Sequence, residues 1–195
     1  MGNTYSVKKQ VEKITTSVVI SRKREDILAA EKLILPGVGH FKAAMENLAS
    51  YGILECLHEA VIERKKPILG ICLGMQLMTN FSEEGNVKGL SWIDAEIKSF
   101  DFKDKAKFKR PHMGWNQIVR HKKSSLLEGL SEENEYYFVH SYYLKSNCKS
   151  DILCSTEYEF EFGCAFEKDN IYGVQFHPEK SHLAGEKMIK NFILL

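Results

Sequence analysis

A single cysteine lies between two glycines in the segment GICLGMQL, residues 70–77, directly after the apolar run 67–69. The pattern predicts a sharp turn from a buried strand into a helix, because glycines two residues before and two after the cysteine let neighbouring elements approach closely. The N-terminus of the following helix favours a thiolate, so Cys72 is a candidate nucleophile. The alternative is a small core cysteine, which the flanking Gly70 and Gly74 disfavour.

A thiol nucleophile needs a general base, and GVQFHPEKS, residues 173–181, contains a candidate. In an extended segment, positions i and i+2 point to the same side, so the carboxylate of Glu179 is expected to accept a hydrogen bond from His177 and fix its tautomer. Cys72, His177 and Glu179 would then be nucleophile, base and orienting acid. An isolated HPE segment is more often a turn with a solvated glutamate. It indicates a catalytic base here only because Cys72 is a candidate nucleophile.

A glycine-containing loop, PGVGH at residues 36–40, ends the strand that precedes the strand of Cys72. In a parallel sheet both loops lie at the carboxyl edge, where open α/β proteins bind ligands. The loop would allow the backbone N–H groups of Gly37 and Val38 to point at a developing oxyanion, with the N–H of Leu73 as a further donor. The alternative is a plain turn.

Apolar periodicity predicts the elements that position these residues. Strand, helix, strand order in the first half implies a parallel sheet, and clustered strands after residue 90 indicate an α+β second half. No repeat or linker divides the chain, so residues 1–195 are predicted to form a single domain. The expected helices are 5–14, 41–48, 54–61, 75–81 and 181–193, and the expected strands are 17–21, 32–35, 67–71, 93–100, 116–120, 135–139, 152–156, 163–167 and 171–175.

Composition excludes several function classes. Lys plus Arg number 27 and Asp plus Glu 26, so no strong field draws the chain to nucleic acid or to an anionic membrane. The N-terminus has no signal-peptide apolar region and no run is long enough to span a bilayer, which predicts a cytoplasmic protein. An odd number of cysteines without CxxC spacing argues against a disulfide framework or a zinc site, and no metal is expected. These cysteines are Cys56, Cys72, Cys148, Cys154 and Cys164.

The motifs PGVGHF, GICLGMQL, KRPHMGWNQI, YYFVHSYY and GVQFHPEKS, in this order, resemble those of class I glutamine amidotransferases. PHMGWN at residues 111–116 and FVHSYY at 138–143 are similar to the glutaminase subunits of imidazole glycerol phosphate synthases. The resemblance covers essentially the whole chain. It implies an α/β, flavodoxin-like three-layer fold with a mostly parallel central sheet.

The resemblance also implies an activity and its residues. A Cys-His-Glu triad at Cys72, His177 and Glu179 would hydrolyse L-glutamine to glutamate and ammonia through a thioester, without a cofactor. The family's glutamine-binding positions match Gly39, Gln76, Glu84, His140, Ser141 and Tyr142, and its partner interface matches Asn3, Trp115, Tyr137 and Lys180.

In this family, ammonia passes to a cyclase subunit with a (β/α)8 barrel, in a heterodimer that makes imidazole glycerol phosphate and AICAR in histidine biosynthesis. A paralogous glutaminase that supplies ammonia for sugar amination in surface-polysaccharide synthesis is one alternative. A non-catalytic scaffold subunit is another, although the complete triad disfavours it. A cysteine peptidase or esterase is disfavoured by Gln76, Glu84 and the VHSYY segment.

The family's chains begin with an apolar strand of about seven residues before the segment at which Met1-Gly2-Asn3 starts here. The family's first β-strand is therefore expected to be missing from this sequence, with Met1 an internal start and several more apolar residues upstream. The alternative is that another segment or chain fills its place in the sheet.

Overall fold

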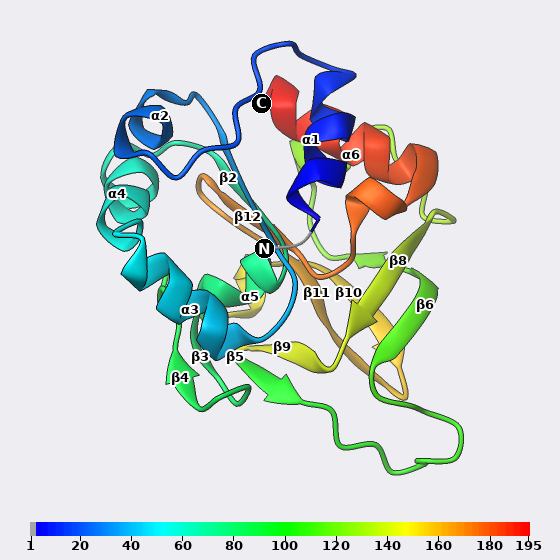
Figure 1. The fold of residues 1–195 in the computed structure, drawn as a ribbon. Coiled ribbons are helices and arrows are strands. Elements are labelled where there is room, and N and C mark those ends of the chain that lie inside the picture. Colours follow the sequence, from blue (N-terminus) through cyan, green and yellow to red (C-terminus); the bar gives the residue numbers. More distant parts are fainter. Residues whose placement is uncertain (1–2) are drawn as a thin grey trace.

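A computed structural model of the chain describes residues 3–195 (Figure 1). The described helices are α1 (Thr4–Glu12), α2 (Arg24–Ala29), α3 (Phe41–Ser50), α4 (Leu54–His58), α5 (Leu73–Leu77) and α6 (His182–Leu194). The strands are β1 (Leu33–Gly37), β2 (Ile68–Cys72), β3 (Thr79–Ser82), β4 (Val87–Lys88), β5 (Ile93–Ser99), β6 (His112–Gln117), β7 (Val119–Arg120), β8 (Glu135–His140), β9 (Tyr142–Ser146), β10 (Ile152–Tyr158), β11 (Phe160–Lys168) and β12 (Ile171–Val174).

The main sheet has the strand order β1-β2-β12-β11-β9-β5-β3-β4, with β10 paired to β11 and β7, while β6 and β8 form a separate pair. Figure 1 shows α1 and α6 packed together on one side of the sheet and α2, α3 and α4 on the other. Each side has its own apolar core. Val7, Val11 and Phe192 belong to the first, and Phe41 and Leu48 to the second.

Helices on both faces of a central sheet confirm the three-layer α/β class, but the sheet is mixed. Parallel pairing is found at β1–β2, β2–β12 and β3–β5, and the other described pairs are antiparallel. The expectation of a mostly parallel sheet therefore holds for β1, β2 and β12, the region that carries Cys72, whereas most pairs elsewhere in the sheet are antiparallel. The reason is connection length, because tight turns such as the one between β10 and β11 can join only antiparallel neighbours.

Two predicted elements near the site differ from the structure. The helix expected over 75–81 lies instead at Leu73–Leu77, and the chain then enters β3, which pairs in parallel with β5. Backbone pairing with β5 overrides the helical periodicity there. Residues 17–21, expected as a strand, contain no strand and leave Val19 exposed, because no described strand pairs with them.

Other expected elements are confirmed with shifted ends, and some were missed. The strand expected over 116–120 is divided between β6 and β7. Helix 54–61 is realised as α4 followed by a π-helical turn, Glu59–Glu63. Sequence patterns did not indicate α2, β3, β4 or β9, which are short. No helix in residues 3–195 combines the length and apolarity needed to cross a membrane.

The junction of β2 and α5 depends on two glycines. A Cβ at Gly70 would lie 2.7 Å from the backbone N and Cα of Met75, and a Cβ at Gly74 would lie 1.7 Å from the carbonyl oxygen of Leu35. Real Cβ atoms do not approach backbone so closely, so α5 can pack on β1 and β2 only if both positions are glycine. This confirms the physical reason for the GxCxG spacing.

We expect Gly74→Ala to lower the free energy of unfolding by more than about 3 kcal/mol, because rigid backbone must move to admit the methyl group. Chemical denaturation followed by circular dichroism measures it. Gly163→Ala is the matched control, since its added Cβ would meet only the side-chain ends of Ile152 and Leu144. Equal effects of the two substitutions would contradict the role assigned to the junction.

Candidate active site

Cys72 is the last residue of β2 and immediately precedes α5. Its backbone has φ 54° and ψ −113°, a conformation that non-glycine residues rarely adopt, and only 7% of the residue is exposed. The register of β1 and β2 places Gly37 directly opposite Cys72. The end of the PGVGH loop and the candidate nucleophile are therefore neighbours across two parallel strands.

His177 and Glu179 form a hydrogen-bonded pair in the protein interior. Nδ1 of His177 lies 2.7 Å from Oε1 of Glu179, and both side chains are almost fully buried. The backbone N–H of His177 donates to the carbonyl of Tyr137, and Ser181 Oγ donates to the carbonyl of His177. The extended conformation expected here is wrong beyond His177, since residues 178–180 form a 3-10 helical turn that brings the carboxylate to the ring.

The environment of His177 favours the imidazolium. Burial alone would lower its pKa, but hydrogen bonds and charge interactions with Cys72 and Glu179 outweigh burial and raise the pKa to about 9. A cationic imidazole beside a cysteine sulfur is the kind of environment in which thiol nucleophiles are activated. The structure thus hydrogen-bonds His177 to Glu179 and places the same imidazole where it interacts with Cys72.

Three of the remaining cysteines have environments that disfavour thiolates. Burial raises the pKa of Cys56, raises that of Cys154 to about 12, and raises that of Cys164 well above its ordinary value. Cys148 is partly exposed, with its Sγ 3.0 Å from Ser150 Oγ. All five cysteines are free thiols.

The PGVGH loop lies against the start of α5. A Cβ at Gly37 would be 2.9 Å from the backbone N of Gly74 and 3.0 Å from Cβ of Leu73, so the loop and the helix N-terminus are in close contact. Gly39 has φ +104° and open space around it, while the side chain of Val38 is partly exposed. The backbone N–H groups predicted for an oxyanion site thus come from two adjoining segments beside Cys72.

Gln76 lies one helical turn after Cys72 and is 5% exposed. Its Nε2 donates to the carbonyl of Tyr142 at 3.4 Å and to Oε1 of Gln175 at 2.8 Å. The carbonyl of Ser141 accepts from the N–H of Phe100. The predicted glutamine-binding segment 140–142 is therefore joined directly to the helix that follows the candidate nucleophile.

Glu84 lies beside the PGVGH loop from a different part of the chain. Its Oε2 accepts a 2.7 Å hydrogen bond from the N–H of Phe41, at the start of α3. This carboxylate caps the helix and so holds the end of the loop in place. A structural role accompanies the substrate-binding role predicted for Glu84.

A buried pair of histidines supports segment 140–142. His140 donates through Nδ1 to the carbonyl of Tyr142 at 2.7 Å, so its Nε2 can only accept from His112 Nδ1, 2.9 Å away. Burial lowers the pKa of His112 to about 4 and that of His140 to about 3. Sequence patterns did not reveal this pair, because residues 28 apart in the sequence meet only through β6–β8 register.

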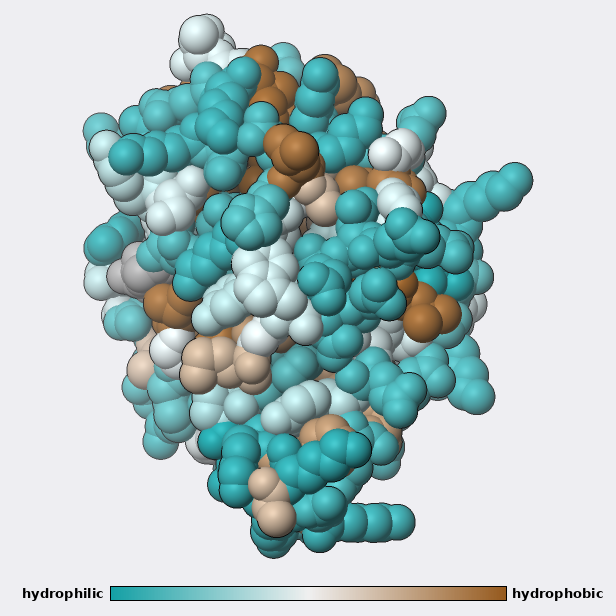
Figure 2. Space-filling model, turned by 90° about the vertical axis from the view of Figure 1, so that its right-hand side faces the viewer, coloured by the Kyte–Doolittle hydropathy of each residue, from teal (hydrophilic) through white to brown (hydrophobic). Residues whose placement is uncertain are grey.

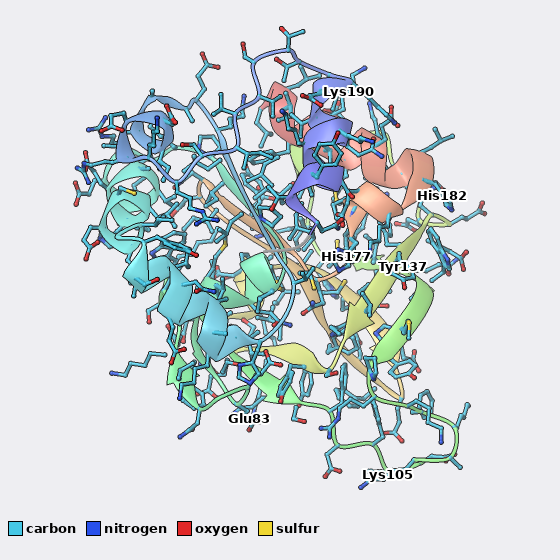
Figure 3. All side chains as sticks on the ribbon, in the orientation of Figure 1. Glu83, Lys105, Tyr137, His177, His182 and Lys190 are labelled. Carbon is cyan, nitrogen blue, oxygen red and sulfur yellow. The ribbon has the colours of Figure 1, made fainter. Side chains whose placement is uncertain are left out.

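Three residues predicted for a partner interface gather at one place on the surface. The rings of Trp115 and Tyr137 lie 5.7 Å apart, and Lys180 Nζ lies 5.4 Å from the centre of the Tyr137 ring. His182, to which the sequence assigned no role, stacks on Trp115 at 4.6 Å. Figure 3 shows His177, Tyr137 and His182 in succession from the middle of the molecule to its right-hand edge.

The surface around this aromatic cluster (Trp115, Tyr137, Lys180 and His182) lies on the side of the molecule formed by β6, β8 and the start of α6. Figure 2 views that side and shows a mainly hydrophilic surface interrupted by pale and hydrophobic residues. Asn3, also predicted for the interface, is partly exposed. Its Nδ2 donates to Oε1 of Glu179, so Asn3 also contacts the candidate active site.

A cysteine on a strand-to-helix turn beside a buried, hydrogen-bonded His–Glu pair is an arrangement typical of thiol-dependent hydrolases of α/β architecture. Within the described residues, no group of His, Cys, Asp or Glu side chains is arranged to hold a metal ion. The family model for class-I glutamine amidotransferases matches residues 1–195.

Individual proteins agree with the family match. The chain is 52% identical over 193 residues to imidazole glycerol phosphate synthase subunit HisH 2 of Methanococcus maripaludis, covering 99% of this chain and 95% of that one. It is 44% identical over 195 residues to subunit HisH 2 of Pseudomonas aeruginosa, covering 100% and 96%. Subunit HisH 1 of Campylobacter jejuni is also 44% identical, over 196 residues, covering 100% and 96%.

Solved structures share the fold at lower identity. A glutamine amidotransferase crystal structure superposes with a TM-score of 0.73 at 15% identity, covering 99% of this chain and 93% of that one. The glutaminase domain of Trypanosoma brucei CTPS with bound acivicin gives 0.63 at 15% identity, covering 97% and 83%. The chain therefore belongs to the class-I glutamine amidotransferase family, and within that family to the HisH subunits of imidazole glycerol phosphate synthase.

The buried histidine pair predicts a pH dependence of stability. Folded His112 and His140 stay neutral down to pH values where the same side chains in the unfolded chain, with ordinary pKa near 6.5, are protonated. The unfolded chain thus binds more protons between about pH 6.5 and pH 4, and the free energy of unfolding falls as the pH falls through that window.

Between pH 7 and pH 5, we expect each of the two histidines to lower the free energy of unfolding by about 2 kcal/mol. The glutamine in His112→Gln keeps an N–H donor facing His140 but does not titrate. The free energy of unfolding of this variant should therefore fall by about 2 kcal/mol less than that of the unsubstituted chain over the same pH range. Urea denaturation of both chains at the two pH values measures the difference, in which other titrating groups cancel. Parallel pH profiles would contradict the assignment.

Proposed function

We propose that this chain is the glutaminase subunit that hydrolyses L-glutamine to glutamate and ammonia with Cys72, His177 and Glu179. The observation that carries the proposal is the buried His177, held by Glu179 at Nδ1 and raised in pKa by its contact with Cys72. A thiolate and an imidazolium in contact are what thiol-based amide hydrolysis requires. The family to which the chain belongs hydrolyses glutamine.

In the first half of the reaction, the thiolate of Cys72 attacks the carbonyl carbon of the glutamine side chain. The carbonyl oxygen becomes an oxyanion, which the N–H groups of Gly37 or Val38 and of Leu73 would stabilise. His177 then donates its proton to the amide nitrogen, the C–N bond breaks, and ammonia leaves. The enzyme is left as a thioester of the γ-carboxyl group of glutamate.

In the second half, neutral His177 takes a proton from water as the water oxygen attacks the thioester carbonyl. The C–S bond breaks and glutamate leaves, which restores the thiolate and the imidazolium. Glu179 keeps the imidazole oriented throughout by engaging Nδ1, which leaves Nε2 as the nitrogen that would exchange the proton with Cys72. Gly39, Gln76, Glu84 and segment 140–142 surround the place where glutamine would bind.

The ammonia would pass to a synthase subunit bound at the aromatic cluster. In bulk water ammonia is protonated and lost as a nucleophile, so release into a partner conserves it. Exposed aromatic and cationic side chains in one cluster suit a protein partner. The relatives named as subunits of imidazole glycerol phosphate synthase support a (β/α)8 cyclase as this partner, in a heterodimer that makes imidazole glycerol phosphate and AICAR in histidine biosynthesis.

A second candidate is glutaminase activity for sugar amination in surface-polysaccharide synthesis. The three relatives described above carry the numbers 2, 2 and 1 after the name HisH, a form of name that distinguishes copies. The chemistry of this chain would be unchanged, because the ammonia acceptor binds the partner. Affinity capture of the partner from the native cell, followed by assay of its amination substrate, separates the two.

Replacement of Cys72 by Ala is expected to reduce glutamine hydrolysis at least about 10³-fold while leaving folding and partner binding intact. Glutamate release from the complex measures the loss. Cys148→Ala is the control, because Cys148 is the one cysteine of the five that is partly exposed, and it lies outside the site. Substantial activity in a clean Cys72→Ala preparation would overturn the assignment, as would acivicin labelling of another cysteine in preference to Cys72.

The isolated chain is expected to be nearly silent and to hydrolyse glutamine at least about tenfold faster when bound to a partner subunit that holds its own ligand. Gly39, with its left-handed backbone and open surroundings, gives the oxyanion loop freedom to change conformation. Full turnover without a partner, or unchanged turnover on adding ligand to the complex, would contradict this prediction.

The affinity for the partner tests the surface. Lys180→Ala should weaken the complex at least about tenfold, measured by calorimetric titration. Lys105→Ala should leave affinity unchanged, since Lys105 lies on the loop at the lower edge of Figure 3, away from Tyr137. Equal affinities for both variants would place the partner elsewhere.

A further inference from the structure

Gln175 is a buried amide beside the reacting atoms that the proposed mechanism does not use. It has no exposed surface and follows β12, two residues before His177. Its backbone N–H donates to the carbonyl of Cys164 at 2.8 Å, which ties this position to β11. A polar side chain so deeply buried needs partners for both ends of its amide.

Both ends of that amide face residues of the site. Oε1 of Gln175 accepts from Nε2 of Gln76 at 2.8 Å, and Nε2 of Gln175 lies 3.7 Å from Sγ of Cys72, within hydrogen-bond reach of a sulfur. One side chain therefore bridges the candidate nucleophile and a candidate glutamine-binding residue. Neither contact was expected from the sequence, where Gln175 is simply the end of an apolar strand.

The orientation of the two amides is fixed by a backbone carbonyl. The carbonyl of Tyr142 can only accept, so Gln76 must present its NH₂ group to Tyr142, and the same nitrogen donates to Gln175. Gln175 must then turn its oxygen to Gln76 and its NH₂ group to Cys72. The sulfur of Cys72 consequently faces an N–H donor, which suits a thiolate, because an ionised acceptor forms the stronger hydrogen bond.

We propose that Gln175 is a positioning residue for glutamine hydrolysis, acting through Cys72 on one side and Gln76 on the other. This inference rests on the proposed function, in which Cys72 is the nucleophile. When the Cys72 proton moves to His177, the N–H of Gln175 stabilises the negative charge left on sulfur. When sulfur forms the neutral thioester, that bond loses most of its strength, so its main effect is on the resting thiolate.

The second action of Gln175 is on the substrate side. With both hydrogens of Gln76 Nε2 directed at Gln175 and Tyr142, the group that Gln76 can offer to a ligand is its oxygen, an acceptor. An acceptor there suits the amino or amide N–H groups of glutamine. Loss of Gln175 frees the Gln76 amide to rotate, which should raise KM.

The test compares Gln175→Met and Gln175→Glu with Asn170→Ala. Met removes the donor, and Glu keeps the shape but replaces the donor with a carboxylate oxygen that repels a thiolate. Asn170 is the matched control, because its amide also bridges two groups, the carbonyls of Val61 and Lys66, but at the other end of β12 from the site. The rate of Cys72 alkylation by iodoacetamide is measured against pH by mass spectrometry, on the chain alone and in the complex.

We expect the pH of half-maximal Cys72 alkylation to move up by about one unit in Gln175→Met and at least as far in Gln175→Glu. At pH values below the midpoint, the alkylation rate of Cys72 in these variants should be about tenfold lower than in the unsubstituted chain. KM for glutamine should rise about fivefold or more in both variants, and Asn170→Ala should change neither quantity.

An alkylation profile like that of the unsubstituted chain, in a folded Gln175 variant, would overturn the inference. If Gln175→Met fails to fold, the isosteric Gln175→Glu decides the matter. The outcome is separable from the proposed function. An inactive Cys72→Ala chain with an unshifted Gln175 profile refutes only the positioning role, whereas an active Cys72→Ala chain refutes the nucleophile itself.

Discussion

The close approach of Gly74 to the carbonyl oxygen of Leu35 is the constraint on which the site depends. It lets α5 begin directly over β1 and β2, so that Cys72 occupies the turn with a positive φ. The same packing sets Gly37 beside Leu73 and carries Gln76 to segment 140–142. A single methyl group at position 74 would displace all of these together, because the obstacle is backbone rather than a movable side chain.

Burial gives the site its electrostatic character. Isolated charges are costly in an interior, so a buried imidazolium persists only where opposite charges and hydrogen bonds compensate. Glu179 supplies one such partner and Cys72 the other, and together they outweigh the desolvation of His177. His112 and His140 lack an anionic partner of this kind among their described contacts, and burial keeps them neutral. His177 is therefore expected to be protonated at neutral pH, whereas His112 and His140 are expected to be neutral.

Local patterns predicted much of this molecule. Periodicity predicted nearly all of the longer elements, and the resemblance to class I glutamine amidotransferases implied the three-layer class. The glycine spacing around Cys72 identified the turn, because only glycine permits that contact. Prediction failed where pairing between strands of the sheet determines the secondary structure. β3 replaced part of an expected helix because β5 lies beside it, and the mixed sheet follows from turn lengths in the second half.

The site shows the same division. The grouping of Cys72, His177 and Glu179 was expected from two short motifs, although the turn at residues 178–180 rather than an extended strand brings the last two together. The Gln175 bridge and the His112–His140 pair were not expected, since each joins residues far apart in sequence through strand register. Sequence motifs can predict the reactive residues of this site. The buried amides and imidazoles that orient them are found only from the packing in the structure.

The central claim is that Cys72 and His177 form a thiolate–imidazolium pair oriented by Glu179. The most direct measurement is an NMR titration of the His177 ring in the unsubstituted chain and in Cys72→Ala. The account predicts a His177 pKa of about 9 in the unsubstituted chain and a clear decrease on removing the sulfur, because the hydrogen bond and charge of Cys72 help to hold the proton. A pKa near the ordinary histidine value of about 6.5 that does not respond to the substitution would contradict it.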